Sequence, residues 1–507
     1  MKKIQTKKSF FKIQKILFFS FIALSTVALL FTLFHNLGNN AIADWDEARH
    51  GINAYEMVRS NNWIINTYQY EPDFWNLKPP LSYYLIAMSY QIFGFNAFSL
   101  RLYSAISIIL VFFISLISIY RYRGKLSVVL FGITFLSFSE FFMGHCGRTA
   151  DADALFLLFY LISMISLVAS HKHTWTLYIF GLSFSLAFLS KSFHATTIML
   201  IAILYIIFSK LYKELKIKDY IITALTSSMP ILIWAVFRYL ADGWSFLGIM
   251  FGVDVTERIN TTTNNLSGYL FFIKYLLIDN RSTQIMITVI VLCYIIQAII
   301  NKSIKLKIDN FTLLLILWIM LNVIFFTMTR TQATWYYYPT FLSLILLTSS
   351  ILNDTILLLK DNGIKAHILI FAFTCAFSGL FVSYGLLRTY KNIASTFNIK
   401  ETEAQNAIME FAKANPSFDG YNCYFVKSKS EDAYPYEIQR GKWEQCDVLC
   451  AELNGDYKCI NGGFEKFVDD KNNSIVFIEK SLYNEYEKSH QFEQYDCLTY
   501  TVLVNQK

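Results

Sequence analysis

Long apolar runs recur along most of the chain and set its class. Many of them reach about 16 to 20 residues without a charge, which is enough for a helix to cross the roughly 30 Å hydrocarbon core of a bilayer. Eleven such runs can be distinguished, at residues 16–34, 98–119, 126–142, 154–170, 174–190, 195–209, 219–240, 283–300, 311–328, 336–353 and 366–387. The boundary between 174–190 and 195–209 is the least distinct, because only residues 191–194 separate them. The pattern predicts an all-α polytopic membrane bundle of about 11 spans.

The composition excludes several other classes. The chain of 507 residues is 55% hydrophobic and 16% charged, whereas a soluble domain carries roughly 25% charged residues. A soluble cytosolic enzyme, a disordered chain and a small disulfide scaffold are therefore excluded. Nucleic acid is not an expected partner, since the basic residues lie in short loops between spans rather than on one face.

The basic residues also predict an orientation. If the chain starts in the cytoplasm, the inner loops hold 19 Lys and Arg residues, while the outer loops and span ends before the tail hold 11 over more than twice the length. The positive-inside rule then places the N-terminus inside and the C-terminal tail outside. An alternative is that the first run is a signal peptide, since Ala41-Ile42-Ala43 has the form of a small-residue cleavage site, but the run is long enough to span.

The chain divides into a membrane part, residues 1–393, and an outer soluble domain, residues 394–507. The tail carries 12 Lys and Arg against 19 Asp and Glu, a net charge of −7, and the remainder carries +14. An amphipathic pattern over 403–414 and β-like runs at 421–426 and 474–478 predict an α/β fold for the tail.

Five of the eight cysteines fall in the tail. Outside the cytoplasm they are expected to form two disulfides with one thiol left over. Zinc is a weaker interpretation of Cys446-x3-Cys450, because no pair of histidines accompanies it.

The first outer loop, residues 36–97, faces outward and carries the densest polar chemistry. Asp46 and Glu47 begin a helical pattern, so helix capping explains them as readily as catalysis does. Lys78 precedes two prolines that favour a helix start, and a cation at such a place makes an anion site. A lysine that extends its charged end to the interface is the alternative.

Later outer loops add candidates. Asp151-x-Asp153 begins the fourth span and has the form of a divalent-cation motif, although helix capping is the commoner explanation. Arg258 lies on a cation-poor face, and arginine pairs bidentately with phosphate. Tyr269 and Tyr338 fit an aromatic belt. Together these carboxylates and cations suit chemistry on a lipid phosphate, and no nucleotide-binding fingerprint is present.

These motifs resemble those of the membrane glycosyltransferases of the aminoarabinose lipid A transferase and protein O-mannosyltransferase type. The similar segments are Asp46-Glu47-Ala48-Arg49, Ala54-x-Glu56-Met57, Lys78-Pro79-Pro80-Leu81-Ser82-Tyr83-Tyr84, Phe93-Gly94, Leu100-Arg101-Leu102-Tyr103-Ser104-Ala105 and, more loosely, Arg148-x4-Asp153-Ala154-Leu155, Leu189-Ser190-Lys191 and Tyr338-Pro339. The resemblance extends roughly over residues 16–350.

The resemblance implies a GT-C fold, in which the first outer loop, residues 36–97, forms juxtamembrane helices over the active site. It also implies an inverting transfer of a sugar from a polyprenyl-phosphate donor to a lipid, glycan or protein acceptor. It makes Asp46 the main catalytic carboxylate and Asp153 the second functional acid. It assigns the donor phosphate to Lys78 and Arg258, with Arg49 as a weaker candidate. Further candidates are Glu47, Tyr269 and Tyr338.

Three positions depart from the family pattern. Leu77 stands where the aminoarabinose branch tends to have an acid, so a metal site borrowed from that branch is in doubt, and the sequence allows a divalent metal without requiring one. His50 replaces a tyrosine, and Tyr103 replaces a proline. The sugar and the acceptor stay open, while the resemblance favours a bacterial inner membrane.

Two alternatives complete the interpretation. A related oligosaccharide or O-antigen transferase is the nearest one among enzymes. A transporter or flippase of a lipid-linked glycan is the alternative from another class, but transporters carry charges near the bilayer midplane, and here the spans are charged only toward their ends.

Overall fold

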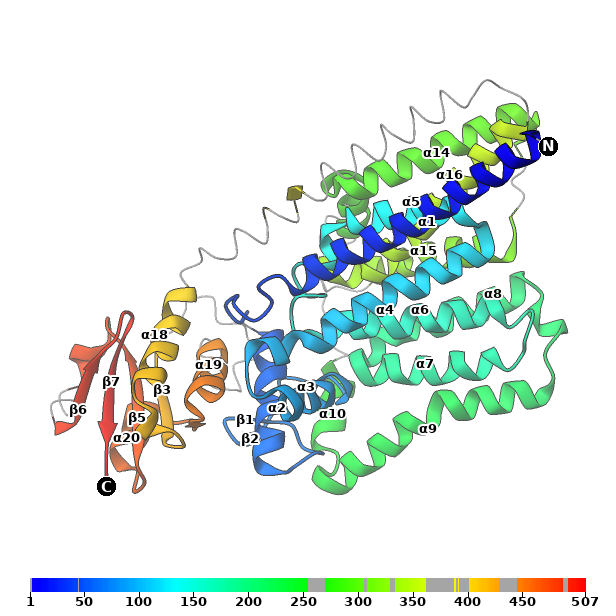
Figure 1. Ribbon diagram of the computed structural model, residues 1–507. Helices are drawn as coiled ribbons and strands as arrows, with labels where there is room; N and C mark the ends of the chain where they lie inside the picture. The colour runs from blue at the N-terminus through cyan, green and yellow to red at the C-terminus, as the bar shows by residue number, and fades with distance from the viewer. Residues whose placement is uncertain are drawn as a thin grey trace.

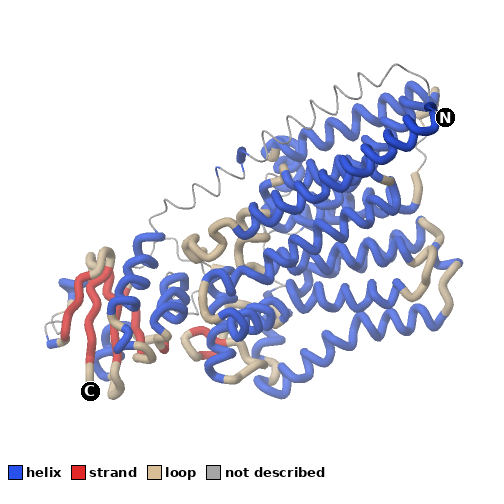
Figure 2. Tube along the Cα trace, viewed as in Figure 1, coloured by secondary structure: helices blue, strands red, loops and turns tan. Residues whose placement is uncertain are grey.

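The computed structural model describes residues 2–43, 45–253, 270–304, 308–328, 333–361, 387–388, 391, 401–427, 445–486 and 491–507. Figures 1 and 2 show three parts: a bundle of long helices, a middle layer of short elements, and a small sheet domain at the end of the molecule away from the N-terminus. We call the end of the bundle next to the middle layer the domain end, and the other the opposite end.

Eight helical segments of the described chain are long and apolar enough to cross a membrane, so the chain is a multi-pass membrane protein. They are Lys15–Phe34 within α1 (Lys2–Phe34), α4 (Ala97–Arg123), α6 (Ala152–Ala169), Thr176–Phe208, α9 (Ile217–Asp242), α14 (Arg281–Asn301), α15 (Asn310–Met328) and Thr334–Asp361, which contains α16 (Tyr338–Asp361). Helix α7 (Thr176–Lys191) packs between α6 and α9, and α16 packs against α14, α15 and α5 (Lys125–Leu136).

Two of the predicted runs differ from single long helices. Run 126–142 yields only α5 (Lys125–Leu136) and a 3-10 turn at Ser139–Phe141, because the serines and Glu140 interrupt its apolar character. Run 366–387 lies outside the described residues, except for residue 387.

The least distinct pair of runs forms two helices within one apolar segment. Helix α7 (Thr176–Lys191) and α8 (Thr196–Phe208) are separated by a 3-10 turn in which Ser192 has φ 55°. Tyr205, near the end of α8, contacts His171, which precedes α7, with ring centroids 5.9 Å apart. The chain therefore reverses at Ser192, and α7 and α8 run antiparallel.

The middle layer lies between the bundle and the sheet domain (Figure 1). It consists of α2 (Asp46–Ser60), β1 (Thr67–Tyr68), β2 (Glu71–Pro72) and α3 (Leu81–Phe93). Every side chain of α2 from Glu47 to Met57 is buried, because α3 packs against α2 on one side and α19 (Gln445–Gly455) of the sheet domain on another. Short helices α10 (Ser245–Phe251) and α13 (Phe271–Lys274) and a π turn (Tyr275–Asp279) follow α9.

The C-terminal domain is a five-stranded sheet with helices, so the α/β prediction for the tail is confirmed. Its elements are α18 (Glu401–Ala414), β3 (Asn422–Val426), α19 (Gln445–Gly455), β4 (Lys458–Cys459), α20 (Gly463–Asp469), β5 (Ser474–Glu479), β6 (Glu493–Asp496) and β7 (Tyr500–Asn505). The strand order is β4-β3-β5-β7-β6. Strand β3 is parallel to β4 and β5, while β7 is antiparallel to its two neighbours.

The prediction of two disulfides in the tail is wrong, since all five tail cysteines are free thiols in the structure. Their surroundings give the reason. Cys423 and Cys459 are buried in the sheet, and the thiols of Cys450 and Cys459 hydrogen-bond backbone carbonyls of Gln405 and Val448. These cysteines serve as small apolar core residues.

Candidate active site

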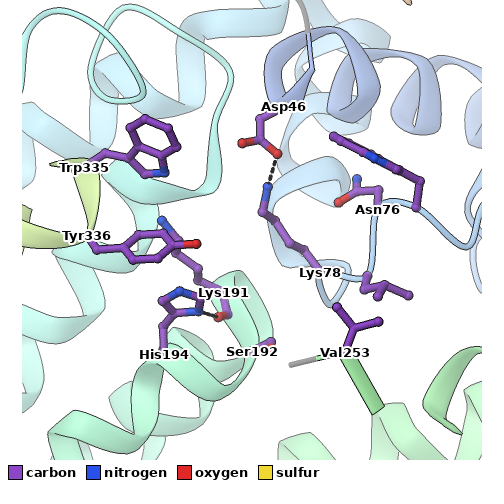
Figure 3. Close-up of a pocket in the computed structure, with 11 residues that line it drawn as sticks. Asp46, Asn76, Lys78, Lys191, Ser192, His194, Val253, Trp335 and Tyr336 are labelled. Atoms are coloured by element: carbon purple, nitrogen blue, oxygen red, sulfur yellow. Dashed lines mark hydrogen bonds and ion pairs between the residues drawn. The ribbon is translucent and has the colours of Figure 1, made fainter. Parts of the chain in front are cut away.

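A cavity of about 240 Å³ lies at the domain end of the bundle. It is bounded by the loop before α3, the turn after α7 and the segment before α16 (Figure 3). Its lining residues are Asp46, Trp75, Asn76, Leu77, Lys78, Lys191, Ser192, His194, Val253, Trp335 and Tyr336. Two of the predicted site residues, Asp46 and Lys78, therefore line one cavity.

Asp46 and Lys78 form an ion pair across this cavity wall. Asp46 is the first residue of α2, and its carboxylate faces Lys78; no side chain caps this helix start. Capping is therefore not what the Asp46 carboxylate does. The loop that carries Lys78 is held by the hydroxyl of Tyr83, which donates to the Lys78 carbonyl at 2.7 Å. His50 Nδ1 donates to the Asp46 carbonyl at 2.5 Å.

A second carboxylate, Asp151, completes the surroundings of Lys78. Its Oδ1 lies 3.9 Å from Lys78 Nζ, and its Oδ2 accepts a hydrogen bond from His145 Nδ1 at 2.5 Å. His145 also lies 3.9 Å from the Asp46 carboxylate and stacks on Trp335, with ring centroids 3.9 Å apart. Two carboxylates, one ammonium and one imidazole thus form a single ionic cluster beside the cavity.

The charges of the cluster shift the pKa values of Lys78, Asp151 and His145 toward their charged forms. Burial by itself lowers the pKa of Lys78, but the charges of Asp46 and Asp151 outweigh burial and raise it. Burial would raise the pKa of Asp151, yet Lys78 and then His145 hold it well below its usual range. The pKa of His145 is raised, because the hydrogen bond and charge of Asp151 exceed the effect of burial. His50 behaves oppositely: burial and then the Lys78 charge lower its pKa to about 4, so it is neutral.

The structure separates the two acids of the Asp151-x-Asp153 motif. Asp151 caps α6, its Oδ1 accepting from the backbone of Ala152 at 2.7 Å, and also faces Lys78. Asp153 lies in the first turn of α6 and pairs with Lys191, and both side chains are almost fully buried. Lys191 Nζ lies 4.8 Å from the centre of the Tyr336 ring. Asp153 therefore meets the cavity only through Lys191.

Glu47 fastens the middle layer to the bundle. Its carboxylate accepts from Arg101 of α4 at 2.7 and 3.0 Å, and from the backbone N–H groups of Ala43 and Ala150. Arg101 also donates to the carbonyls of the loop between α1 and α2. This buried network fixes where α2 begins and hence where the Asp46 carboxylate lies.

Arg49 and Tyr338 do not line the cavity. Arg49 is fully buried, with its guanidinium 3.6 Å from the Tyr68 ring centre and 3.8 Å from the Asp73 carboxylate. Tyr338 is buried at the start of α16 against Phe141. Two further predicted residues lie outside the described part of the chain, Arg258 and Tyr269.

Sequence reasoning missed His145, Trp335 and the partner role of Lys191. Lys191 could have been predicted, since it occurs in one of the looser family-like segments. His145 had no motif to mark it, and its role depends on a fold that brings its loop against the start of α2.

One group among the described residues has the spacing of a metal site. The ligand atoms of Asp46, His145 and Asp151 lie within 4.8 Å of one another. Their donor types suit a divalent cation. The Lys78 ammonium already contacts both carboxylates, so a metal would have to displace or share that cation.

Comparisons with known proteins agree with the resemblance seen in the motifs. A family described as dolichyl-phosphate-mannose-protein mannosyltransferase matches residues 77–234. An undecaprenyl phosphate-alpha-4-amino-4-deoxy-L-arabinose arabinosyl transferase from Pseudomonas savastanoi is 24% identical over 353 residues, 66% of this chain and 61% of that protein. The protein of the same name from Yersinia pestis strain Pestoides F is 24% identical over 394 residues, 71% of this chain and 65% of that protein. An uncharacterized protein of Aquifex aeolicus is 25% identical over 45% of this chain and 46% of its own length. The chain thus spans between about half and two thirds of these relatives.

Solved structures establish the fold. ArnT from Cupriavidus metallidurans bound to undecaprenyl phosphate has a TM-score of 0.69 at 12% identity, covering 96% of this chain and 97% of that one. The same protein in the apo state has a TM-score of 0.66 at 11% identity over the same shares. The chain has the GT-C fold that its motifs predict.

Proposed function

We propose that the protein is an integral-membrane glycosyltransferase that moves a sugar from a polyprenyl-phosphate donor to a lipid acceptor. The observation that carries the proposal is the Lys78 ammonium, held against the carboxylates of Asp46 and Asp151 at the wall of a cavity. The printed names of the arabinosyl transferase relatives and of the undecaprenyl phosphate complex support the donor class.

The donor phosphate binds where the cations gather. Lys78 and Lys191 both line the cavity, and His145 adjoins Lys78 through Asp151. As the sugar leaves, negative charge develops on the lipid phosphate, and cations already fixed in place stabilise that charge. Arg258 remains a further phosphate ligand by its resemblance to the family, with Arg49 a weaker one.

Asp46 serves the acceptor. A hydroxyl acceptor needs a base within hydrogen-bond reach, and Asp46 lies at the cavity wall. A phosphate acceptor arrives ionised, so Asp46 then orients it and compensates the charge of Lys78 rather than removing a proton.

Asp153 acts through Lys191, whose ammonium group it holds in place. Glu47, Tyr269 and Tyr338 are supporting candidates. The proposed acceptor is a lipid rather than a glycan or a protein.

The site belongs on the outer face of a bacterial inner membrane. The excess of Lys and Arg in one set of loops supports an inner N-terminus and an outer tail. Residues 1–393 would then be the catalytic membrane part and residues 394–507 the outer domain.

The charged residues at the site neutralise one another, and the proposed transfer does not require a metal.

The test is transfer from a panel of radiolabelled polyprenyl-phosphate sugars to native membranes. We expect the wild type to transfer label, and Asp46→Asn and Lys78→Ala each to lose about a hundred-fold or more in rate, as when a transition-state partner is removed. Lys480→Ala is the matched control, since its pair with Asp496 is exposed on the sheet domain. Gel filtration checks that every variant is folded. If no donor is consumed, or if both variants transfer normally, the proposal is wrong and transport of a lipid-linked glycan becomes the function to test.

A further inference from the structure

A second cavity lies toward the opposite end of the bundle, away from the candidate active site; Figure 1 shows α1, α4 and α5, the helices that line it. It is a groove of about 460 Å³ between α1, α4 and α5. Its lining residues are Lys15, Phe18, Phe19, Ile22, Phe113, Leu116, Ile117, Tyr120, Lys125 and Val128. Nothing in the proposed transfer reaction uses this groove.

The groove is apolar along its length and accessible from the lipid side. Leu116 and Val128 form its floor, with exposed fractions of 6% and 2%, whereas Ile117 and Tyr120 at its edge are 67% and 50% exposed. Because α1 and α4 contain membrane-spanning segments and α5 is a shorter apolar helix packed against them, hydrocarbon chains rather than water are in contact with this surface.

Two lysines give the groove a charged rim. Lys15 Nζ lies 6.0 Å from the Phe19 ring centre, and Lys125 Nζ lies 5.7 Å from the Phe18 ring centre. Both ammonium groups therefore project over neighbouring rings of the same groove. None of its lining residues is acidic, and residues 1–14 contain five lysines and no acid.

We propose that this groove binds an anionic glycerophospholipid. One acyl chain lies along the apolar floor, and the headgroup phosphate lies between Lys15 and Lys125. An apolar channel ending at two cations matches a molecule that joins a hydrocarbon chain to a phosphate. A net negative headgroup is favoured over a zwitterionic one, because a zwitterionic headgroup brings a cation of its own toward the two lysines.

The test is native mass spectrometry of the full chain in detergent with equal amounts of phosphatidylglycerol and phosphatidylcholine. We expect the wild type to retain phosphatidylglycerol about ten-fold more than phosphatidylcholine. The double variant Lys15→Ala/Lys125→Ala should lose this preference. The matched control is Lys172→Ala/Lys213→Ala, which removes two exposed lysines from the same end of the bundle outside the groove.

A filling variant tests the apolar part separately. Ile117→Trp places a large side chain at the edge of the groove, and we expect it to reduce bound phosphatidylglycerol while the protein still elutes as a folded species. The proposal is overturned if Lys15→Ala/Lys125→Ala keeps the preference, because the two lysines then do not select the headgroup. It is also overturned if the control loses the preference equally, because net charge alone then explains it, or if Ile117→Trp binds as much phosphatidylglycerol as the wild type.

Discussion

At the scale of single residues, the candidate site is a set of charges that neutralise one another. Lys78 contacts Asp46 and Asp151, His145 contacts Asp151, and Lys191 contacts Asp153. A buried charge is stable only when it is paired, so each of these groups depends on its partner for its own position. The same arrangement leaves two lysine ammonium groups at the cavity wall, where a phosphate can exchange with a carboxylate.

For the Asp153–Lys191 pair, we expect that replacing both partners restores the stability lost in each single variant but does not restore activity. Removing one partner leaves a buried charge unpaired and costs about 3–5 kcal/mol, so Asp153→Asn or Lys191→Met should each lower the melting temperature strongly. The double variant Asp153→Leu/Lys191→Met buries no charge and should regain most of that stability. Thermal melts and transfer assays on all three variants measure the effect. Transfer that returns together with stability would contradict a role for Lys191 at the cavity.

His145 predicts a pH dependence. Its pKa is raised above that of a free histidine, burial being outweighed by the hydrogen bond and charge of Asp151. The imidazolium and its pair with Asp151 are therefore fully present below about pH 6.5 and are lost as the pH rises through the raised pKa. We expect the transfer rate to fall on the alkaline side, with a flatter alkaline limb in His145→Gln. Identical alkaline limbs in the two proteins would exclude this titration from the mechanism.

At the scale of elements, α2 connects the site to the sheet domain. Asp46 begins this helix, and Tyr55 near its other end donates to Asp456 of the sheet domain at 2.8 Å. The backbone of Ile42, just before the helix, exchanges two hydrogen bonds with the Gln405 side chain, at 2.8 and 2.9 Å. The sheet domain therefore holds both ends of the segment that carries Asp46, the proposed catalytic carboxylate.

Two buried carboxyl groups face each other across the contact between α2 and α19. Burial, together with the neighbouring carboxyl Glu56, holds the pKa of Glu452 well above its usual range. Burial likewise raises the pKa of Glu56 to about 8, although Tyr70 donates its backbone N–H to this carboxyl at 3.1 Å. Both groups are therefore protonated at neutral pH in the folded protein, and ionising either one opposes the contact.

Glu56 thus makes stability fall with rising pH. Its folded pKa lies above its unfolded value, so its favourable contribution is complete below about pH 4.5 and is lost progressively up to about pH 8. We expect Glu56→Gln to lose less stability than the wild type between pH 6 and 8.5, by about 2 °C or more in melting temperature. Differential scanning fluorimetry at these pH values measures the difference. Parallel pH curves would show that Glu56 does not titrate in this range.

At the scale of the whole molecule, the apolar pattern and the motif resemblance predicted most of the architecture. Span positions follow from local hydrophobicity, and two β-like runs of the tail became β3 and β5. The sequence could not show that α2 is buried on all sides, because that burial comes from the sheet domain, some 400 residues away along the chain. The disulfide prediction failed for the same kind of reason: cysteine number and compartment say nothing about whether each thiol lies in a sheet core.

The site was predicted in part. Asp46 and Lys78 could be selected from their motifs, but only the fold brings them together and adds His145 and Asp151. Of the Asp151-x-Asp153 motif, the resemblance selected Asp153 as the second functional acid, whereas the acid in the ionic cluster is Asp151. Side chains two positions apart at a helix start point in different directions, so Asp151 faces the cluster and Asp153 pairs with Lys191 inside the bundle.

The most direct test of the central claim is the binding of undecaprenyl phosphate to the purified protein. Microscale thermophoresis in detergent should show that Lys78→Ala weakens binding by about ten- to a hundred-fold, as expected for loss of a charged hydrogen-bond donor to phosphate. Lys480→Ala, with its exposed pair on the sheet domain, should bind as the wild type does. If Lys78→Ala folds and binds undecaprenyl phosphate with unchanged affinity, the cavity beside Lys78 is not the polyprenyl-phosphate site.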